Sequence, residues 1–464
     1  LLATLVSSLS LLIDELELRD ELLSLGRLAY TVADEFEQFE GTVNRRKQLP
    51  DDASKACVLF VDRSLGLVAP LSHRNENILD AIRAVLPPFD SIDVAVDMTT
   101  ICHAESVMTI AGPIVAKGTL SCLPQAKLTE IHDLKWKLGP LYLRDEFMSL
   151  AEWRNLQDKI ELSEDPVRFV RKNLQIFKEC TARQILENGH ALVAVSALSE
   201  ALSSPGMQRR YEKLAIEKIF TQNATENSLS GALDGGEPLV QLAENRDKTK
   251  LEFEDLVTLY LYINSLCGED LYIDQRSREG FQQGLLSALT EDTLRNPNSW
   301  SGLARQLIPS LNATEAKLQA AIVRVEEAVA RVAAQRRSLK SLRKVLTRGD
   351  LAHPSTYRPL VVELVKTLKA NVDCPDIELH SSSQGVLGGL GFLMGAMGAA
   401  MGGAVSGPLE PADVLIVVVL GGVTFAEVAM LEQLMADTGK QLIVITTGLL
   451  TPKETLKHIF ASLM

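Results

Sequence analysis

Residues 413–446, DVLIVVVLGGVTFAEVAMLEQLMADTGKQLIVIT, decide the fold. The apolar run at 413–420 predicts a β-strand, and Gly421 and Gly422 predict the turn that follows it. A stretch with helical spacing comes next, and a second apolar run at 441–446 predicts another strand. Because both strands are apolar on both faces, we expect them in a parallel sheet that helices cover on each side.

The helix of this unit is predicted to begin with a capping box. Thr424 and Glu427 have the required spacing, in which each side chain bonds the backbone of the other. The alternative is a phosphate site, because the free amides at a helix N-terminus favour anions. The stretch lacks the glycine patterns of nucleotide-binding loops, and Glu427 would itself occupy the amides. We therefore favour a structural turn.

A second apolar run, CVLFV at 57–61, predicts a strand that ends at Asp62, Arg63 and Ser64. Ligands of open α/β sheets usually bind at the carboxyl ends of strands, so these residues would suit a catalytic or ligand-binding site. No nucleophile, base or metal ligand stands at a supporting spacing. We favour a turn in which the Asp62 carboxylate caps the following loop and the Arg63 guanidinium packs against neighbouring backbone.

The remaining sequence has a helical middle between two α/β ends. Residues 1–48 are predicted to be helical, and residues 92–98 to form a further strand. The middle shows almost only helical spacing, with helices expected at 164–203, 207–221, 251–267, 275–290 and from about Thr314 to Leu346. Each α/β end is too short for a complete doubly wound domain.

We therefore predict an α/β fold, in which an interrupted parallel-sheet, Rossmann-like domain carries a large, mainly α-helical inserted domain. The first part of the sheet domain is expected at 1–110, the helical insert at 111–375 and the second part of the sheet domain at 376–464. A single sheet made from both ends would supply the strands that neither end has alone.

Composition excludes several classes of function. The formal net charge of −13 repels phosphate backbones, so no nucleic-acid partner is expected. The six cysteines and seven histidines form no zinc or disulfide pattern, which predicts a reduced, cytoplasmic protein without a metal. No catalytic motif is found, so we expect no enzyme, no cofactor and no small-molecule substrate.

Because the sequence starts at Leu1 without an initiator Met, we expect a fragment of a longer chain.

The best interaction candidate is the basic end of the long helix expected from about Thr314 to Leu346. Its cationic residues are Arg331, Arg336, Arg337, Lys340, Arg343, Lys344 and Arg348. The helix dipole favours cations near a helix C-terminus, so a solvated face is the default interpretation. The functional alternative is a landing site for an acidic partner helix or for anionic lipid headgroups.

The Gly-rich run at 385–407 has 23 uncharged residues, enough in length to span a bilayer. Nine of them are glycine, which makes the run a poor helix. We favour a mobile loop or a packed connector over membrane contact.

Three stretches resemble the SM (Sec-one/Munc-eighteen-like) family. They are VLFVDRSLGLVAPLSHRNENIL at 58–79, STYRPLVVELV at 355–365 and VLIVVVLGGVTFAEVAMLEQL at 414–434, in the same order and at similar spacing. Other segments are similar to a divergent branch of that family. Through this resemblance six residues are identified as a structural signature: Asp62, Arg63, Gly421, Gly422, Thr424 and Glu427.

The resemblance implies a non-enzymatic regulator of vesicle fusion that binds syntaxin-like SNARE proteins and aids SNARE complex assembly. The family's SNARE-templating hairpin would include the helix from about Thr314 to Leu346. The family's N-terminal domain, with its syntaxin sites, is absent from this sequence, and Gly66 and Ala69 depart from the usual residues. The alternative is a vesicle-tether or adaptor scaffold with the same fold and a non-SNARE partner. Either protein is expected in the cytoplasm, in peripheral contact with endomembranes such as the Golgi, the ER or vesicles.

Overall fold

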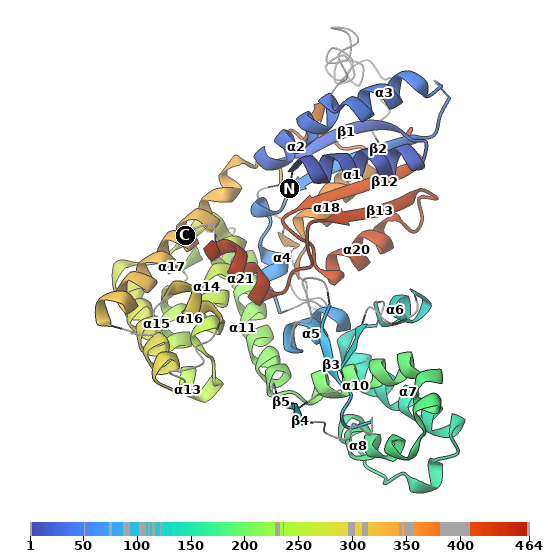
Figure 1. Ribbon diagram of the computed structural model, residues 1–464. Helices are drawn as coiled ribbons and strands as arrows, with labels where there is room; N and C mark the ends of the chain where they lie inside the picture. Colours follow the sequence, from blue (N-terminus) through green and yellow to red (C-terminus); the bar gives the residue numbers. More distant parts are fainter. Residues whose placement is uncertain are drawn as a thin grey trace.

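The computed structural model shows a sheet covered by helices and two helical groups beside it (Figure 1). The residues that it describes are 2–50, 52–73, 77–86, 93–101, 108–109, 112–113, 117–120, 123, 125–132, 134–227, 233–234, 236–295, 302–308, 314–342, 346–347, 356–380 and 409–461. The Gly-rich run at 385–407 lies outside them, so its predicted role as loop or connector stays a prediction.

The main sheet has five strands in the order β11, β1, β2, β12, β13. Their bounds are Glu378–His380 for β11, Arg19–Leu25 for β1, Lys55–Asp62 for β2, Val414–Leu420 for β12 and Gln441–Thr446 for β13. Four strands are parallel, and β11 pairs antiparallel with β1 at one edge. Because β2 pairs with β12, the two ends of the chain share one sheet, as predicted.

Helices cover both faces of the sheet, as the apolar strands predicted. Helices α1 (Leu2–Glu15) and α2 (Arg27–Gln38) pack on one face, against alternate strand residues such as Val58 and Ile416. Helices α18 (Leu360–Lys369) and α20 (Phe425–Met435) pack on the other face, against the intervening residues. This alternation buries both faces of β2 and β12. The carboxyl ends of these two strands lie beside the helical groups (Figure 1).

The prediction of helix throughout residues 1–48 was wrong at β1. Leu22 packs on the α1 face and Leu23 on the α18 face, so the segment has the two-residue period of a strand buried on both sides. Tertiary burial therefore overrides the local helical spacing of its leucines. The predicted strand at 92–98 shrinks to β3 (Ala95–Asp97), which pairs with β6 (Lys117–Thr119) outside the main sheet.

The first helical group surrounds α14 (Phe253–Cys267), whose residues from Leu256 to Leu266 are all buried. A helix that is buried all round lies at the centre of its group. Packed against it in one hydrophobic core are α12 (Gly236–Glu244), α15 (Gln275–Arg295), α16 (Gly302–Leu307), α17 (Glu315–Gln335) and α21 (Pro452–Ala461).

The second helical group has its own core, formed by α5 (Ile78–Val85), α7 (Gly139–Trp153), α8 (Pro166–Asn173) and α10 (Gly189–Ser203). Helix α11 (Pro205–Asn227) joins the two groups, because Met207 packs in the second core and Phe220 in the first. The predicted helices at 207–221, 251–267 and 275–290 are confirmed, each with at least one end shifted, whereas the one predicted at 164–203 is interrupted between α8 and α10.

Shorter elements connect these parts. They are α3 (Glu40–Gln48), α4 (Val68–Leu71), α6 (Gln125–His132), α9 (Ala182–Glu187), α13 (Arg246–Thr249), β4 (Met108–Thr109), β5 (Gly112–Pro113), β7 (Leu233–Asp234), β8 (Leu271–Tyr272), β9 (Leu346–Thr347), β10 (Thr356–Tyr357) and the 3-10 turns η1 (Arg63–Leu65), η3 (Trp136–Leu138), η4 (Gln157–Lys159), η5 (Leu174–Glu179), η6 (Gly268–Asp270) and η7 (Arg336–Ser338). The expected domain boundaries at 110/111 and 375/376 stay a prediction.

The long helix ends earlier than its apolar stripe predicted. Helix α17 stops at Gln335, η7 follows, and the chain is extended at Leu339. Leu339 and Leu342 continue the helical spacing in the sequence, but they pack against the sheet core with α18. The expected end at Leu346 is therefore wrong, because these leucines belong to a different core from the α17 stripe.

In the part of the chain that the structure describes, no helix is long and apolar enough to cross a membrane. The same part holds no cluster of His, Cys, Asp or Glu side chains that would bind a metal ion.

Candidate functional site

The residues after β2 form the predicted turn. The Asp62 carboxylate accepts a hydrogen bond from the Ser64 amide at 2.9 Å, which caps η1. Its other oxygen accepts one from the Leu28 amide at 3.2 Å, at the start of α2. Both oxygens of Asp62 therefore hold backbone, and the carboxylate ties β2 to α2.

Arg63 is buried and binds across the sheet to the start of α20. Its Nε donates to the Gly422 carbonyl at 2.7 Å, and Nη1 donates to the Gly66 carbonyl at 3.0 Å. Nη1 and Nη2 also pair with the two carboxylate oxygens of Glu427 at 2.8 and 2.9 Å. Sequence reasoning expected the backbone contacts but missed this bidentate pair, whose partners are 364 residues apart.

The glycine turn after β12 is required by close packing. Gly421 and Gly422 have φ values of +108° and +109°, which L side chains rarely adopt. A Cβ at Gly422 would lie 2.5 Å from the Leu450 side chain. This turn brings the start of α20 against Arg63.

The start of α20, where a phosphate site was the alternative, has no backbone amide left for an anionic ligand. The predicted capping box is present, since Thr424 Oγ1 accepts from the Glu427 amide and Glu427 accepts from the Thr424 amide. Asp80 of α5 accepts from the next two amides, those of Phe425 at 3.0 Å and Ala426 at 2.8 Å. Burial raises the pKa of Asp80 to about 6, although both amides oppose the shift.

Sequence reasoning missed Asp80, and it also missed the pair of His73 and Glu217. Glu217 accepts from the Ser72 hydroxyl at 2.8 Å and from the His73 amide, and it lies 2.6 Å from His73 Nδ1. Burial lowers the pKa of His73 to about 4. Both side chains are buried, so this pair joins α11 to the loop after α4 rather than facing a substrate.

The cations predicted at the end of α17 differ in burial. Arg336 is buried, and its guanidinium donates to the carbonyls of Ser265, Leu266 and Leu342 at 3.1 to 3.4 Å. It therefore caps the C-terminal turn of α14, where a cation is favoured. The expectation of Arg336 on a basic surface face is wrong.

The other predicted cations have different positions. Arg331, Arg337 and Lys340 are exposed, and Arg331 also donates to the Ile459 carbonyl of α21 at 3.2 Å. Arg343, Lys344 and Arg348 lie outside the described residues. Because α17 ends at Gln335, the cations do not form one stripe on a continuous helix.

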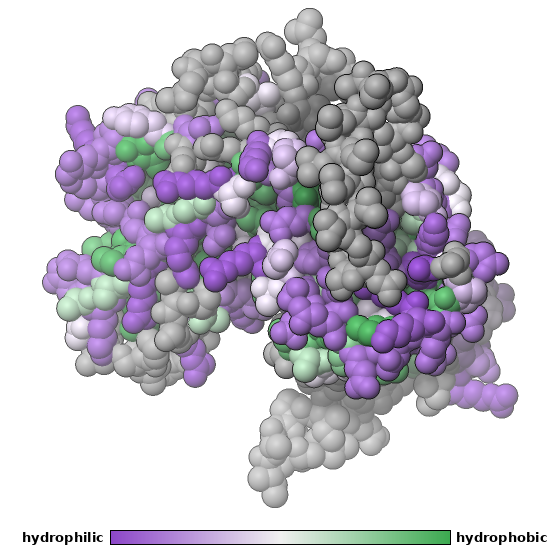
Figure 2. All heavy atoms as spheres, turned by 90° about the horizontal axis from the view of Figure 1, so that it is seen from above, coloured by the Kyte–Doolittle hydropathy of each residue, from purple (hydrophilic) through white to green (hydrophobic). Residues whose placement is uncertain are grey.

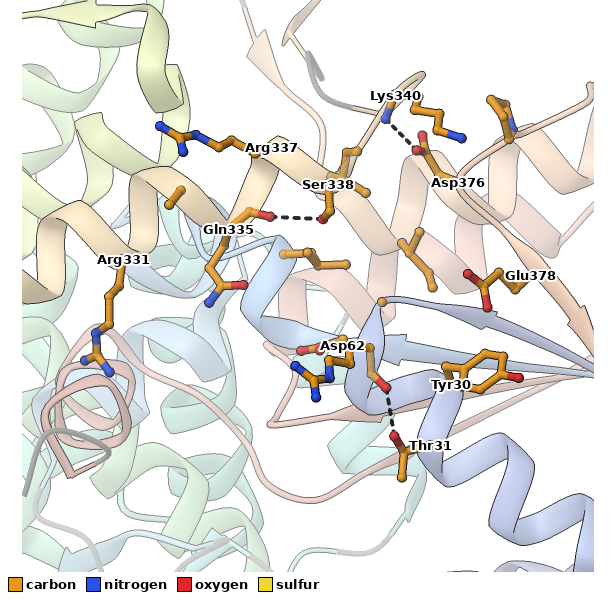
Figure 3. A pocket seen from close by; sticks show the side chains of 17 residues that line it. Tyr30, Thr31, Asp62, Arg331, Gln335, Arg337, Ser338, Lys340, Asp376 and Glu378 are labelled. Carbon is orange, nitrogen blue, oxygen red and sulfur yellow. Dashed lines mark hydrogen bonds between the residues drawn. The ribbon is translucent and has the colours of Figure 1, made fainter.

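A groove lies between the end of α17 and the carboxyl edge of β1 and β2 (Figure 3). We call it the α17 groove; its lining includes Arg27, Tyr30, Asp62, Arg331, Gln335 and Lys340. Its larger hollow has a volume of about 920 Å³, and a smaller hollow of about 360 Å³ shares three of the lining residues, Asp62, Arg331 and Gln335. In Figure 3 Gln335 projects from α17 toward the wall that carries Asp62 and Tyr30.

Asp376 stabilises the wall of the α17 groove that carries Lys340. Its carboxylate accepts from the Lys340, Ser341 and Leu342 amides at 2.5 to 2.8 Å and from the Ser341 hydroxyl at 2.7 Å. Burial alone would raise the pKa of Asp376, but these hydrogen bonds lower it. The carboxylate thus fixes the chain after η7 and positions Lys340.

The chain is similar to known proteins over nearly its whole length. The sequence profile of the Sec1 family matches residues 259–458. Human Sec1 family domain-containing protein 2 is 28% identical over 477 residues, which cover 99% of this chain and 67% of that protein.

Two solved structures share the fold. In the Unc18–syntaxin 1 complex from Monosiga brevicollis the match has a TM-score of 0.56 at 14% identity and covers 99% of this chain and 71% of that chain. In Vps45 bound to the Qa SNARE Tlg2 the TM-score is 0.52 at 16% identity, over 99% of this chain and 70% of that chain. At such identities the likeness is one of fold.

Proposed function

The chain belongs to the Sec1 family, also called the SM family, and we propose that it regulates vesicle-mediated transport and membrane fusion by binding a syntaxin-like SNARE protein and aiding SNARE complex assembly. Proteins of this family are not enzymes. In this proposal the protein works in the cytoplasm and associates peripherally with endomembranes of the Golgi, the ER or vesicles.

One observation carries the proposal. The SM fold extends over 99% of this chain in structures whose proteins were crystallised with syntaxin 1 and with the Qa SNARE Tlg2. The pairing of β2 with β12 and the helical residues between them support a sheet domain made of 1–110 and 376–464, with the helical domain at 111–375 inserted. We propose α17 as the part of this helical domain that a SNARE helix contacts.

The signature residues have a structural role in this proposal. Arg63 and Glu427 are buried together, and Asp62 and Thr424 each cap a backbone segment. We propose instead that the exposed cations Arg331, Arg337 and Lys340 bind the partner. Arg343 and Lys344 join this proposal on the sequence alone.

The second candidate is a tether or adaptor scaffold that has the SM fold and binds a non-SNARE partner. The observation that favours it is the early end of α17 and the burial of Arg336, which together shorten the basic helical face. A shorter face offers less length for pairing with a long SNARE helix.

The test is affinity purification of the full-length protein from cells, followed by crosslinking mass spectrometry. The double variant Arg337→Glu/Lys340→Glu is compared with Arg168→Glu/Arg171→Glu, which reverses two exposed charges on α8. We expect a syntaxin-like SNARE whose crosslinks to residues 315–340 disappear in the first variant and persist in the second. Recovery of a tether or coat subunit without any SNARE would contradict the proposal and favour the scaffold.

A further inference from the structure

The α17 groove combines an apolar interior with a basic rim. Its two hollows share Asp62, Arg331 and Gln335, so they form one continuous depression along the carboxyl ends of β1, β2 and β12. Ligand pockets of roughly 300–1,000 Å³ enclose most of the surface of a drug-sized molecule. The depression is therefore large enough for a short stretch of polypeptide.

Apolar side chains stand at the mouth and in the smaller hollow. Leu28 and Tyr30 of α2 are 50% and 46% exposed. The smaller hollow is lined by Leu28 together with Val332, Leu450 and Ile459. Large apolar side chains that line a concave site are typical of positions where a partner inserts an apolar residue.

The charge of the α17 groove is opposite to that of the whole molecule. Arg27, Arg337 and Lys340 are exposed along the groove, in a chain whose net charge is −13. Three acidic side chains line the larger hollow of the groove. Asp62 and Asp376 each bind backbone amides with both carboxylate oxygens, and the third is Glu378. The local field therefore attracts a negatively charged ligand.

The shape of the α17 groove favours a polypeptide over a membrane. Peripheral membrane binding needs an apolar face that projects into the bilayer, whereas these apolar residues lie in a depression. On the face of the molecule that Figure 2 shows, hydrophilic residues predominate and apolar residues form only small patches between them. A charged, concave and apolar site fits one extended or helical segment.

We propose that the α17 groove binds an acidic segment of a partner protein that carries one large apolar residue. The acidic side chains pair with Arg27, Arg337 and Lys340 at the rim, and the apolar residue enters the smaller hollow beside Leu28. This inference deepens the proposed function and rests on it for the premise that a protein partner binds here.

The test is fluorescence anisotropy of the full chain with a fluorescein-labelled peptide of Glu and Leu at helical spacing. We expect affinity to fall with rising salt, and to fall at least tenfold, or about 1.4 kcal/mol, in Arg337→Glu/Lys340→Glu. Leu28→Asp, at a half-exposed position, should weaken binding to a similar extent. The α8 variant Arg168→Glu/Arg171→Glu should bind as the wild type does, and a Glu–Ser peptide should bind weakly to all of them.

Equal affinity for the groove variants and the α8 variant would overturn the inference. So would vesicles of phosphatidylcholine and phosphatidylserine that bind through Arg337 and Lys340 while the peptide does not bind. If the peptide fails but a SNARE is captured from cells, the inference is wrong and the proposed function survives. If the peptide binds through the α17 groove but no SNARE is captured, the inference stands and the proposed function is wrong.

Discussion

Arg63 and Arg337 each follow the end of a regular element, yet one is enclosed by the fold and the other faces solvent. Arg63 is 5% exposed and binds Glu427 and two carbonyls, whereas Arg337 lies on the rim of the α17 groove. The recognisable strand-end motif therefore holds the sheet together, while the exposed cations that a partner can reach lie at the adjacent helix end. Arg336, the neighbour of Arg337, belongs with Arg63 in this comparison because it too is buried against backbone carbonyls.

The largest effect is expected from breaking the buried pair. Arg63→Ala leaves Glu427 buried without its cation, which should lower the free energy of unfolding by about 3–5 kcal/mol. Urea unfolding measures the loss, and Arg337→Ala is the matched control on the exposed side. An equal, small loss in both variants would remove the distinction between the two arginines.

The next effect depends on pH and concerns Asp80. Its folded pKa of about 6 lies above the unfolded value near 4, so the folded state binds more protons over this interval. The stability of the wild type relative to Asp80→Asn should therefore be greatest at low pH and decline as pH rises through about 6, by roughly 3 kcal/mol in total. Urea unfolding of both proteins between about pH 3 and 7 tests this, and a difference that stays constant with pH would contradict it.

A smaller loss is expected at Arg336. Arg336→Met keeps the buried chain length but removes the donors to the carbonyls of Ser265, Leu266 and Leu342. The free energy of unfolding should fall by about 2 kcal/mol. Arg337→Met should change it by less than about 0.5 kcal/mol, because the side chain is exposed. Thermal and urea unfolding of the two variants would show whether adjacent arginines differ as the structure requires.

The smallest effect is expected at the start of α20. Thr424→Ala removes one half of the capping box and should cost about 1 kcal/mol. Thr424→Ser keeps the hydroxyl and should recover most of that loss. If alanine and serine behave alike in urea unfolding, the hydroxyl does not cap this helix.

The sequence predicted those parts of the fold that local patterns determine. The apolar runs of β2, β12 and β13, the glycine turn and the capping box at Thr424 were all recognisable, because strand, turn and cap each have a local chemical requirement. Strand β1 was missed because the spacing of its leucines also suits a helix, and only its position between β11 and β2 decides the matter.

The candidate site was less predictable because its contacts join distant residues. Asp80 binds amides that follow it by 345 and 346 residues, and no local pattern reports such a partner. Its one visible signal is an acid within the apolar face of α5. The end of α17 was misplaced because Leu339 and Leu342 keep the helical spacing while packing against another core. The α17 groove itself forms only when that end meets the sheet.

The most direct test of the division between structural motif and partner surface is hydrogen exchange of the full chain with and without the Glu–Leu peptide. We expect slower exchange on binding at residues 26–31 and 331–342, with a smaller change at residues 58–66 and 414–427, whose ends line the α17 groove but whose strand amides are already hydrogen-bonded in the sheet. Protection confined to the strand ends at 58–66 and 414–427 would contradict this expectation, and would make the signature motif itself the binding site.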